Sequence, residues 1–373
     1  MLRLHYIDIR PEYLDQGGGG LFANLVYNDT LASNFIDWDN GFIGGIFHLF
    51  GRDDLRTATA YRLRETIRQG VGVNNLYCNF ISQNNYTDCA FAAWVTVIPV
   101  YEQNHDPLLR QAMVDILDYT MLGYNPTYNN FAHTPGTVFW IDAAGGKPQF
   151  YWYMAELLGD DIYKTHARRM INFIIDTMQD SQGWFNGRYN FANGTFTQTY
   201  WSGAQGWAGV GLLEFRDIIK NDSAEQALVD KINTSLEKFA DNMASRPIAD
   251  LEDDSRRRSY IAYALLWLAN DPIFPVAKRQ VWQQRGDQLL LNAFQSMNAS
   301  TAQLNQYGLT FYSNFAQSFP DYYMLKLLHQ FYPDTEFFPN STGQTYTFSD
   351  PTRNHSIYQA YVTSSTSIDW RSE

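Results

Sequence analysis

The sequence predicts an all-α protein in which six helical hairpins close into an (α/α)6 barrel. A phrase that joins an aromatic-rich, small-residue helix to a polar, mostly acidic turn recurs about six times along the 373 residues. The copies are about 50 to 60 residues apart, a period typical of stacked helical hairpins. A more amphipathic helix fits between most copies. The apolar helices would therefore line the inside of a ring and the amphipathic helices its outside.

The copies define the expected elements in order. They begin near Trp38, Asp88, Asp142, Ser202, Arg258 and Phe315. The first five hairpins are expected to end near Arg68, Leu122, Met178, Ala244 and Met297. Because a hairpin buries its apolar face only against its neighbours, we expect residues 1–373 to form a single catalytic domain.

Several segments between and around the hairpins lack helical periodicity. Residues 1–33 are expected to form an N-terminal strap, and the tail from Phe337 onward is rich in Ser, Thr and Asn. Residues 123–141 form a long aromatic loop, which we expect to be an ordered wall of a pocket. Residues 181–201 alternate aromatic and small polar residues, which predicts a β-hairpin or ordered loop at the barrel mouth.

Composition excludes two classes of partner. The net charge is −12, and the longest basic run is Arg256 to Arg258, so clustered phosphate contacts with nucleic acid are not expected. No stretch approaches the ~20 apolar residues that span a bilayer, so no membrane partner is expected. The aromatic share of 16% is high, and aromatic residues with polar handles suit sugar-binding clefts.

Cysteines and glycosylation sequons bear on the compartment. The two cysteines, Cys78 and Cys89, flank a polar loop, so a disulfide between them is possible. The N-x-S/T sequons lie at Asn28, Asn85, Asn193, Asn221, Asn233, Asn298, Asn340 and Asn354. So many sequons suggest a secreted protein. The first residues, MLRLHYIDIR, lack the apolar core of a signal peptide, so an intracellular protein is the alternative.

Two aspartates are the candidate catalytic groups. Asp88 and Asp142 each stand at the start of a predicted inner helix, after a long polar loop. In a ring of hairpins all inner helices start at the same rim, so both carboxylates would face one pocket. Paired carboxylates in an aromatic cleft are typical of enzymes that cleave glycosidic bonds. The alternative for each aspartate is a helix N-cap, because its carboxylate accepts backbone N–H bonds well.

Four segments between about residues 36 and 270 carry a family resemblance. They are HTPGTVFWIDAAGGKP with His133, Pro135, Trp140 and Asp142, the pair Thr87–Asp88, DSQGWFNGRY over 180–189, and WSGAQGW over 201–207. In order and spacing they resemble the unsaturated rhamnogalacturonyl hydrolases (glycoside hydrolase family 105). They also resemble the related unsaturated glucuronyl hydrolases of family 88.

The resemblance implies a site and a chemistry. Asp142 would be the general acid and base, and Asp88 would position water or stabilise developing positive charge. The remaining substrate-binding candidates are Trp140, Trp201, Trp207, His133, Gln205, Arg188, Lys147 and Trp38. The alternative for His133 is hydrogen bonding within its own loop, and the alternative for Gln205 is capping of its helix. The acid would protonate C4 of a 4,5-unsaturated uronic acid while water adds at C5, and an aromatic, partly dry pocket would keep the acid protonated. No metal or organic cofactor is required.

The sequence departs from the family pattern at two places. Asn186 stands where the family commonly has His, and Gly203 stands where it commonly has Arg. Both family residues help to hold the substrate, and Arg188 or Lys147 would restore a positive group here.

The expected function is removal of a terminal unsaturated uronic acid from short pectin-derived, rhamnogalacturonan-type oligosaccharides. Two alternatives remain open. One is a conventional glycosidase or polysaccharide lyase on the same barrel, such as an endo-mannanase. The other is a carbohydrate-binding protein without catalysis. The sequence does not indicate the neighbouring sugar or the oligomeric state.

Overall fold

The computed structural model describes only part of the 373 residues. The described ranges are 25–27, 30–32, 39–49, 53–70, 87, 89–133, 136–199, 201–251, 257–295, 297–298, 303–304, 315–317, 322–323, 326–327 and 330–331.

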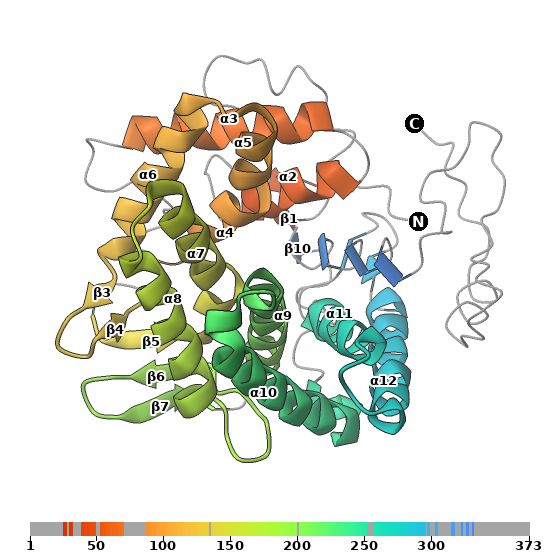
Figure 1. The fold of residues 1–373 in the computed structure, drawn as a ribbon. Helices are drawn as coiled ribbons and strands as arrows, with labels where there is room; N and C mark the ends of the chain where they lie inside the picture. Colours follow the sequence, from red (N-terminus) through yellow and green to blue (C-terminus); the bar gives the residue numbers. More distant parts are fainter. Residues whose placement is uncertain are drawn as a thin grey trace, which may run out of the picture.

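Five helical hairpins follow one another along this part of the chain (Figure 1). In each, the inner helix is named first. The first pairs α2 (Asp39–Leu49) with α3 (Asp53–Gly70). The second pairs α4 (Cys89–Ala92), η1 (Ala93–Val97) and α5 (Ile98–Asn104) with α6 (Pro107–Met121). The third pairs α7 (Lys147–Leu158) with α8 (Ile162–Phe173) and η3 (Ile174–Met178). The fourth pairs α9 (Ser202–Ile219) with α10 (Gln226–Ser245), and the fifth pairs α11 (Arg257–Asn270) with α12 (Val276–Gln295).

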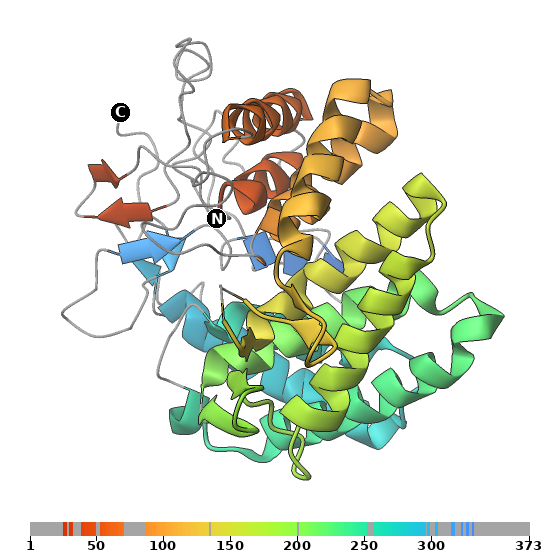
Figure 2. The same cartoon turned by 90° about the vertical axis from the view of Figure 1, so that its left-hand side faces the viewer.

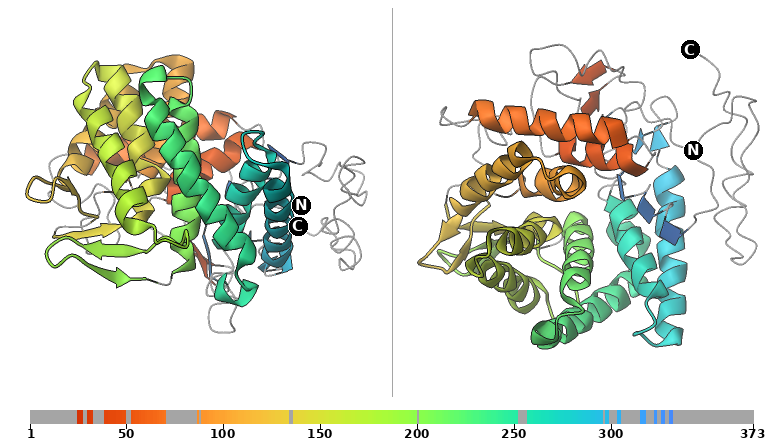
Figure 3. Two further views of the ribbon diagram at one scale, coloured as in Figure 1. Left: turned by 60° about the horizontal axis from the view of Figure 1, so that its bottom comes forward. Right: turned by 45° about the horizontal axis from the view of Figure 1, so that its top comes forward.

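The inner helices close into a ring. Neighbouring inner helices pack on one another in chain order, from α2 through η1, α7 and α9 to α11. Helical residues at 322–323, 326–327 and 330–331 occupy the sixth inner position. There the Tyr323 ring lies 5.9 Å from Phe42 of α2 and 5.9 Å from Tyr260 of α11, between centroids. Figure 3 (right) shows the helix pairs arranged around this ring.

The inner helices are buried because their residues are small or apolar. Almost all of α9 is buried, whereas α10 buries one face that includes Ile232, Leu236 and Phe239. At Gly211 an added Cβ would lie 2.0 Å from the carbonyl oxygen of Ala144, so only glycine permits this approach of α9 to the third hairpin. The predicted division into apolar inner and amphipathic outer helices holds for this pair.

The sixth repeat differs from the prediction at its start. We expected an inner helix from about Phe315, but Phe315–Gln317 is a strand, β10, that pairs antiparallel with β1 (Leu25–Tyr27). β1 also pairs with β2 (Thr30–Ala32), so part of the predicted N-terminal strap is a small sheet beside the helices (Figure 2). Pairing with a strand distant in sequence outweighs local helical pattern here. The tail from Phe337 lies outside the described residues.

The predicted wall and mouth segments contain short strands. β3 (Tyr124–Asn125) pairs with β4 (Asn130–Phe131), and β5 (Val138–Trp140) pairs with β6 (Arg188–Asn190). β6 continues into β7 (Thr195–Gln198), which confirms the predicted hairpin. The three-stranded β5–β6–β7 sheet lies where the third and fourth inner helices begin, because η2 (Ile141–Gly145) directly follows β5 and α9 follows β7. The remaining short elements are η4 (Ser223–Glu225), η5 (Ile248–Leu251), β8 (Met297–Asn298) and β9 (Gln303–Leu304).

The structure also bears on the possible disulfide and on whether any helix could span a membrane. Cys89 is disulfide-bonded, and Cys78 is the only other cysteine of the sequence. Among the described residues, none of the helices combines the length and the apolarity needed to cross a membrane.

Candidate active site

The site is built where β5 runs into η2. Trp140 ends β5, and Asp142 follows two residues later in the first turn of η2. On the neighbouring strand, Arg188 is the antiparallel partner of Trp140. Side chains of paired residues project to the same face of a sheet, so this register brings a cation and an indole together beside the aspartate.

Trp140 lies between two partners. The His133 ring stacks on it at 4.1 Å between centroids with an angle of 2° between the planes. The Cζ of Arg188 lies 3.6 Å from the centroid of the Trp140 ring. Two planar groups this close to one ring centre would overlap on a single face, so they occupy opposite faces. We expected Trp140 to stack on a sugar ring, but a sugar could do so only if His133 or Arg188 moved.

Asp142 is half-buried, and its position does not match the N-cap alternative. The N-cap residue of η2 is Trp140, and that of α7 is Gly146. The carboxylate lies close enough to Arg188 to raise the pKa of the guanidinium, against the larger lowering caused by burial. Asp142, Trp140, Arg188 and His133 therefore form one group at the start of the third inner helix.

The electrostatic field of this group favours anions. Burial lowers the pKa of His133 to about 3, and the charges of Lys147 and Arg188 lower it further. The imidazole is consequently neutral at physiological pH, and two cations act on it. This positive region contrasts with the net charge of −12 for the whole chain.

Gln198 is a polar residue of the site that the sequence did not reveal. It is the cross-strand partner of Arg188 in the β6–β7 hairpin. Its Oε1 and the Nε of Arg188 are both buried, and neither has a hydrogen-bond partner among the described residues. Only the strand register could have singled it out, because Gln198 lies in an ordinary alternating segment.

Two candidate residues are held in the protein interior. Lys147 is fully buried, its Nζ donates to the Thr120 carbonyl oxygen at 3.1 Å, and it lies 4.4 Å from the centre of the Phe131 ring. Gln205 is also fully buried, and its side chain bonds both the N–H and the carbonyl oxygen of Phe185, at 3.0 and 2.7 Å. We expected both to contact the substrate. In the structure, the side chains of both residues instead hydrogen-bond to backbone groups around the site. Lys147 affects the site through its charge, which lowers the pKa of His133.

Trp201 and Trp207, the two other candidate tryptophans within the described residues, lie at different depths. Trp201 is half-buried and packs against Gly187, where an added Cβ would lie 2.9 Å from the indole. Trp207 is 3% exposed and lies in the aromatic core, 5.0 Å from Phe91 and 5.3 Å from Tyr260 between ring centroids. We predicted that both stack on sugar. Trp201 packs against Gly187, the residue that precedes Arg188, whereas Trp207 is covered by other rings.

The two departures from the family pattern are structural in this chain. The backbone N–H and the side-chain Nδ2 of Asn186 both donate to the Met178 carbonyl oxygen, at 2.8 and 3.0 Å. Gly203 lies buried in the first turn of α9, and its carbonyl oxygen accepts from the Tyr260 hydroxyl at 3.4 Å. Neither position supplies a cation to the site.

Asp88 and Trp38, also predicted for the site, lie outside the described residues. The neighbours of Asp88, Thr87 and Cys89, are both buried, and Cys89 begins the second inner helix.

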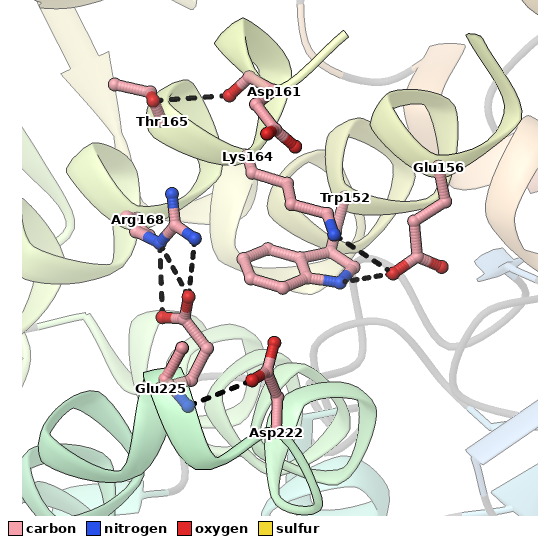
Figure 4. A network of polar contacts seen from close by, with 9 residues as sticks. Trp152, Glu156, Asp161, Lys164, Thr165, Arg168, Asp222 and Glu225 are labelled. Carbon is pink, nitrogen blue, oxygen red and sulfur yellow. Dashed lines mark hydrogen bonds and ion pairs between the residues drawn. The ribbon is translucent and has the colours of Figure 1, made fainter. Parts of the chain in front are cut away.

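A contrasting polar cluster surrounds Trp152 near the turn between α7 and α8 (Figure 4). Lys164 and Arg168 lie 4.8 and 5.1 Å from the centre of the Trp152 ring. Lys164 pairs with Glu156 at 3.3 Å, and Arg168 makes a bidentate pair with Glu225. In this cluster each cation has a carboxylate.

A more deeply buried ion pair lies inside the ring. Glu214 of α9 accepts from the Trp94 indole at 3.0 Å and from Lys326 at 2.6 Å. These bonds link the second, fourth and sixth inner positions, so the group has a clear role in closing the ring. Among the described residues, no group of three or more His, Cys, Asp or Glu side chains is placed to hold a metal ion.

Solved structures identify the architecture. An unsaturated glucuronyl hydrolase from Bacillus sp. GL1 matches with a TM-score of 0.64 and 16% sequence identity, over 89% of this chain and 94% of that chain. The chain has the (α/α)6 barrel fold. This confirms the predicted fold class, although no family model and no curated protein matches the sequence.

Two further matches show how widely this barrel is used. A possible member of glycoside hydrolase family 105 from Salmonella enterica matches with a TM-score of 0.61 and 11% identity, over 79% of this chain and 82% of that chain. An inactive variant of an α-1,6-mannanase from Salegentibacter sp. HEL1_6, in complex with α-1,6-mannotetrose, matches with a TM-score of 0.60. Its identity is 13%, over 85% of this chain and 96% of that chain. Identities this low establish the fold alone, so function must be argued from the site.

Proposed function

We propose that this protein is a glycoside hydrolase that removes a terminal 4,5-unsaturated uronic acid from short, rhamnogalacturonan-type oligosaccharides. One observation carries the proposal: the half-buried Asp142 stands at the start of an inner helix, beside the cation Arg188. A proton donor and an anion-attracting group in one place suit a substrate that carries both an enol ether and a carboxylate. The fold shared with unsaturated glucuronyl hydrolases supports this assignment by analogy.

The reaction assigned to Asp142 is a hydration. Its carboxylic acid donates a proton to C4 of the C4=C5 double bond, which leaves positive charge shared by C5 and the ring oxygen. Water adds at C5 and returns a proton to the Asp142 carboxylate, so the acid is regenerated. The resulting hemiketal opens and releases the neighbouring sugar. Asp88 is proposed to position that water.

A conventional glycosidase is the second candidate, and the structural similarity to an α-1,6-mannanase favours it over a binding protein. Such an enzyme cleaves saturated glycans and needs no unsaturated substrate. The two candidates therefore differ in whether the double bond is consumed.

The test follows the ultraviolet absorbance of the conjugated double bond. The protein would be incubated with unsaturated galacturonyl-rhamnose and with unsaturated glucuronyl disaccharides. We expect the band to disappear, and we expect Asp142→Asn to slow its loss by about 10²- to 10⁴-fold, the usual contribution of a general acid. Asp161→Asn, an exposed carboxylate at the turn between α7 and α8, is the matched control and should keep full activity. An unchanged band with all substrates, together with cleavage of saturated mannan oligosaccharides, would overturn the proposal.

A further inference from the structure

The Arg188 guanidinium is positioned by its neighbours but has unused capacity to bind an anion. Its Cζ lies over the Trp140 ring, 3.6 Å from the ring centre. Within the part of the chain that the structure describes, the buried Nε has no hydrogen-bond partner and the guanidinium forms no ion pair. Leaving a buried donor without a partner costs free energy that a bound acceptor would recover. Stacking on an aromatic ring also fixes the plane of the guanidinium, which prepares it for a bidentate acceptor.

Gln198 adds an acceptor to this donor. Its buried Oε1 likewise has no partner among the described residues, and the β6–β7 register pairs Gln198 with Arg188. The two side chains do not satisfy each other, although one is a donor and the other an acceptor. A ligand that accepts at Arg188 and donates at Gln198 would satisfy both. A uronic acid does this, because it carries a carboxylate and hydroxyl groups on one ring.

The surroundings support a negative ligand. Lys147 and Arg188 both act on the neutral His133, and Asp142 is the carboxylate that acts on Arg188. When Asp142 is protonated for catalysis, the described charges of the site are positive. A carboxylate bound at Arg188 would then complete the charge balance of the reactive state.

We propose that Arg188 is the specificity-determining residue that binds the carboxylate of the terminal uronate, with Gln198 accepting from a neighbouring hydroxyl group. Trp140 is the positioning residue that holds the guanidinium in place. This inference rests on the proposed function for the reaction, and it assigns the recognition of the acidic group to the β5–β6–β7 sheet. The cation would thus come from the hairpin rather than from position 203, which is glycine in this chain.

The experiment compares two substrates that differ only in the carboxylate. One is an unsaturated uronyl disaccharide, and the other is its carboxyl-reduced counterpart, with release of the neighbouring sugar followed by chromatography. We expect Arg188→Gln to lower kcat/KM about 100-fold or more on the uronide and only a few-fold on the reduced sugar. Arg188→Lys should be intermediate, because it keeps the charge but loses the planar fork. Arg168→Gln, a cation stacked on Trp152, should leave both values unchanged.

Two results would overturn the inference. Equal losses on both substrates would show that Arg188 only supports the site, and no loss on either would show that it has no role. If the wild-type protein cleaves neither substrate, the proposed reaction fails, and calorimetric binding of the same two sugars decides the recognition separately. A preference for the uronide that Arg188→Gln abolishes would then support the inference, and equal binding would contradict it.

Discussion

Trp140 and Trp152 both lie under a basic side chain, but the pairing of those cations differs. At Trp152, Lys164 and Arg168 each face a carboxylate, Glu156 and Glu225. At Trp140, Arg188 has no ion-pair partner among the described residues. Trp140 lies at the end of β5, before the third inner helix begins, whereas Trp152 lies midway along that helix, α7.

The difference separates a contact that stabilises from one that serves a ligand. Stacked and paired cations around Trp152 join α7, α8 and the start of α10, so they hold the ring together. A buried cation without an ion-pair partner lowers the stability of the folded protein. Such groups are typical of functional sites, where a bound ligand supplies the missing partner. Aromatic contact alone therefore does not mark a site, whereas unmatched charge beside an aromatic ring does.

Substituting the two tryptophans should give the largest contrast between an effect on the free energy of unfolding and an effect on activity. Trp152 is 3% exposed, so Trp152→Ala should lower the free energy of unfolding by about 3 to 5 kcal/mol, through lost burial and the cavity left behind. Activity per folded molecule should stay unchanged. Trp140→Phe should instead lower kcat/KM while the free energy of unfolding changes by less than about 1 kcal/mol. Urea denaturation and initial rates on the unsaturated uronide measure both quantities.

If Trp152→Ala does not fold, Trp152→Phe provides the same comparison at a smaller cost. The reverse pattern, with activity lost at Trp152 and stability lost at Trp140, would show that the two clusters have been assigned the wrong way round.

Acidification should weaken the active-site end through His133. Burial depresses its folded-state pKa to about 3, below the ordinary value of 6.5. The unfolded chain binds the extra proton between these values, so stability is fully present above pH 6.5 and falls as the pH drops towards 3. The slope is at most about 1.4 kcal/mol per pH unit for this group. His133→Gln should flatten the dependence measured by urea denaturation between pH 7 and 4.5.

His166 contributes in the same direction, because burial lowers its pKa to about 4, so the dependence should flatten without disappearing. A His133→Gln protein whose stability falls as steeply as that of the wild type would contradict the neutral, buried imidazole.

Removing one charge from the paired cluster should have a moderate effect. Glu225 is 5% exposed and accepts a bidentate bond from Arg168, whose side chain is 37% exposed. Breaking a buried pair costs more than breaking a surface pair, and this half-exposed partner places Glu225→Gln at about 1 to 2 kcal/mol. Thermal and urea unfolding should show the loss, with kcat/KM unchanged. A large loss of activity would instead tie this cluster to the reaction.

The sequence was sufficient for the ring because the repeat carries the information. Small and apolar residues recur in every inner helix, and a residue such as Gly211 is explained by the close approach it permits. The predicted start of the sixth inner helix was wrong, because Phe315–Gln317 pairs with a strand about 290 residues away in sequence. No local sequence pattern contains such a contact.

The site was predictable in part. Motifs pointed to Asp142, Trp140 and Arg188, but they did not predict that His133 and Arg188 cover the two faces of the indole. Gln198 was missed because its place depends on the register of β6 and β7. Side-chain packing and strand register arise from tertiary contacts, so motif spacing could not supply them.

The smallest expected effect comes from exchanging arginine for lysine at the two tryptophans. Arg168→Lys keeps the charge opposite Glu225 but loses the bidentate geometry, so stability should fall by only about 0.5 kcal/mol and kcat/KM should not change. Arg188→Lys should lower stability by no more than Arg168→Lys does, yet lower kcat/KM on the uronide about tenfold, because a carboxylate bound there needs the planar fork. Similar stability of the two variants, with a loss of kcat/KM in Arg188→Lys alone, would show that the arginine serves recognition at Trp140 and not at Trp152. Equal rates in both variants would place the carboxylate away from Arg188.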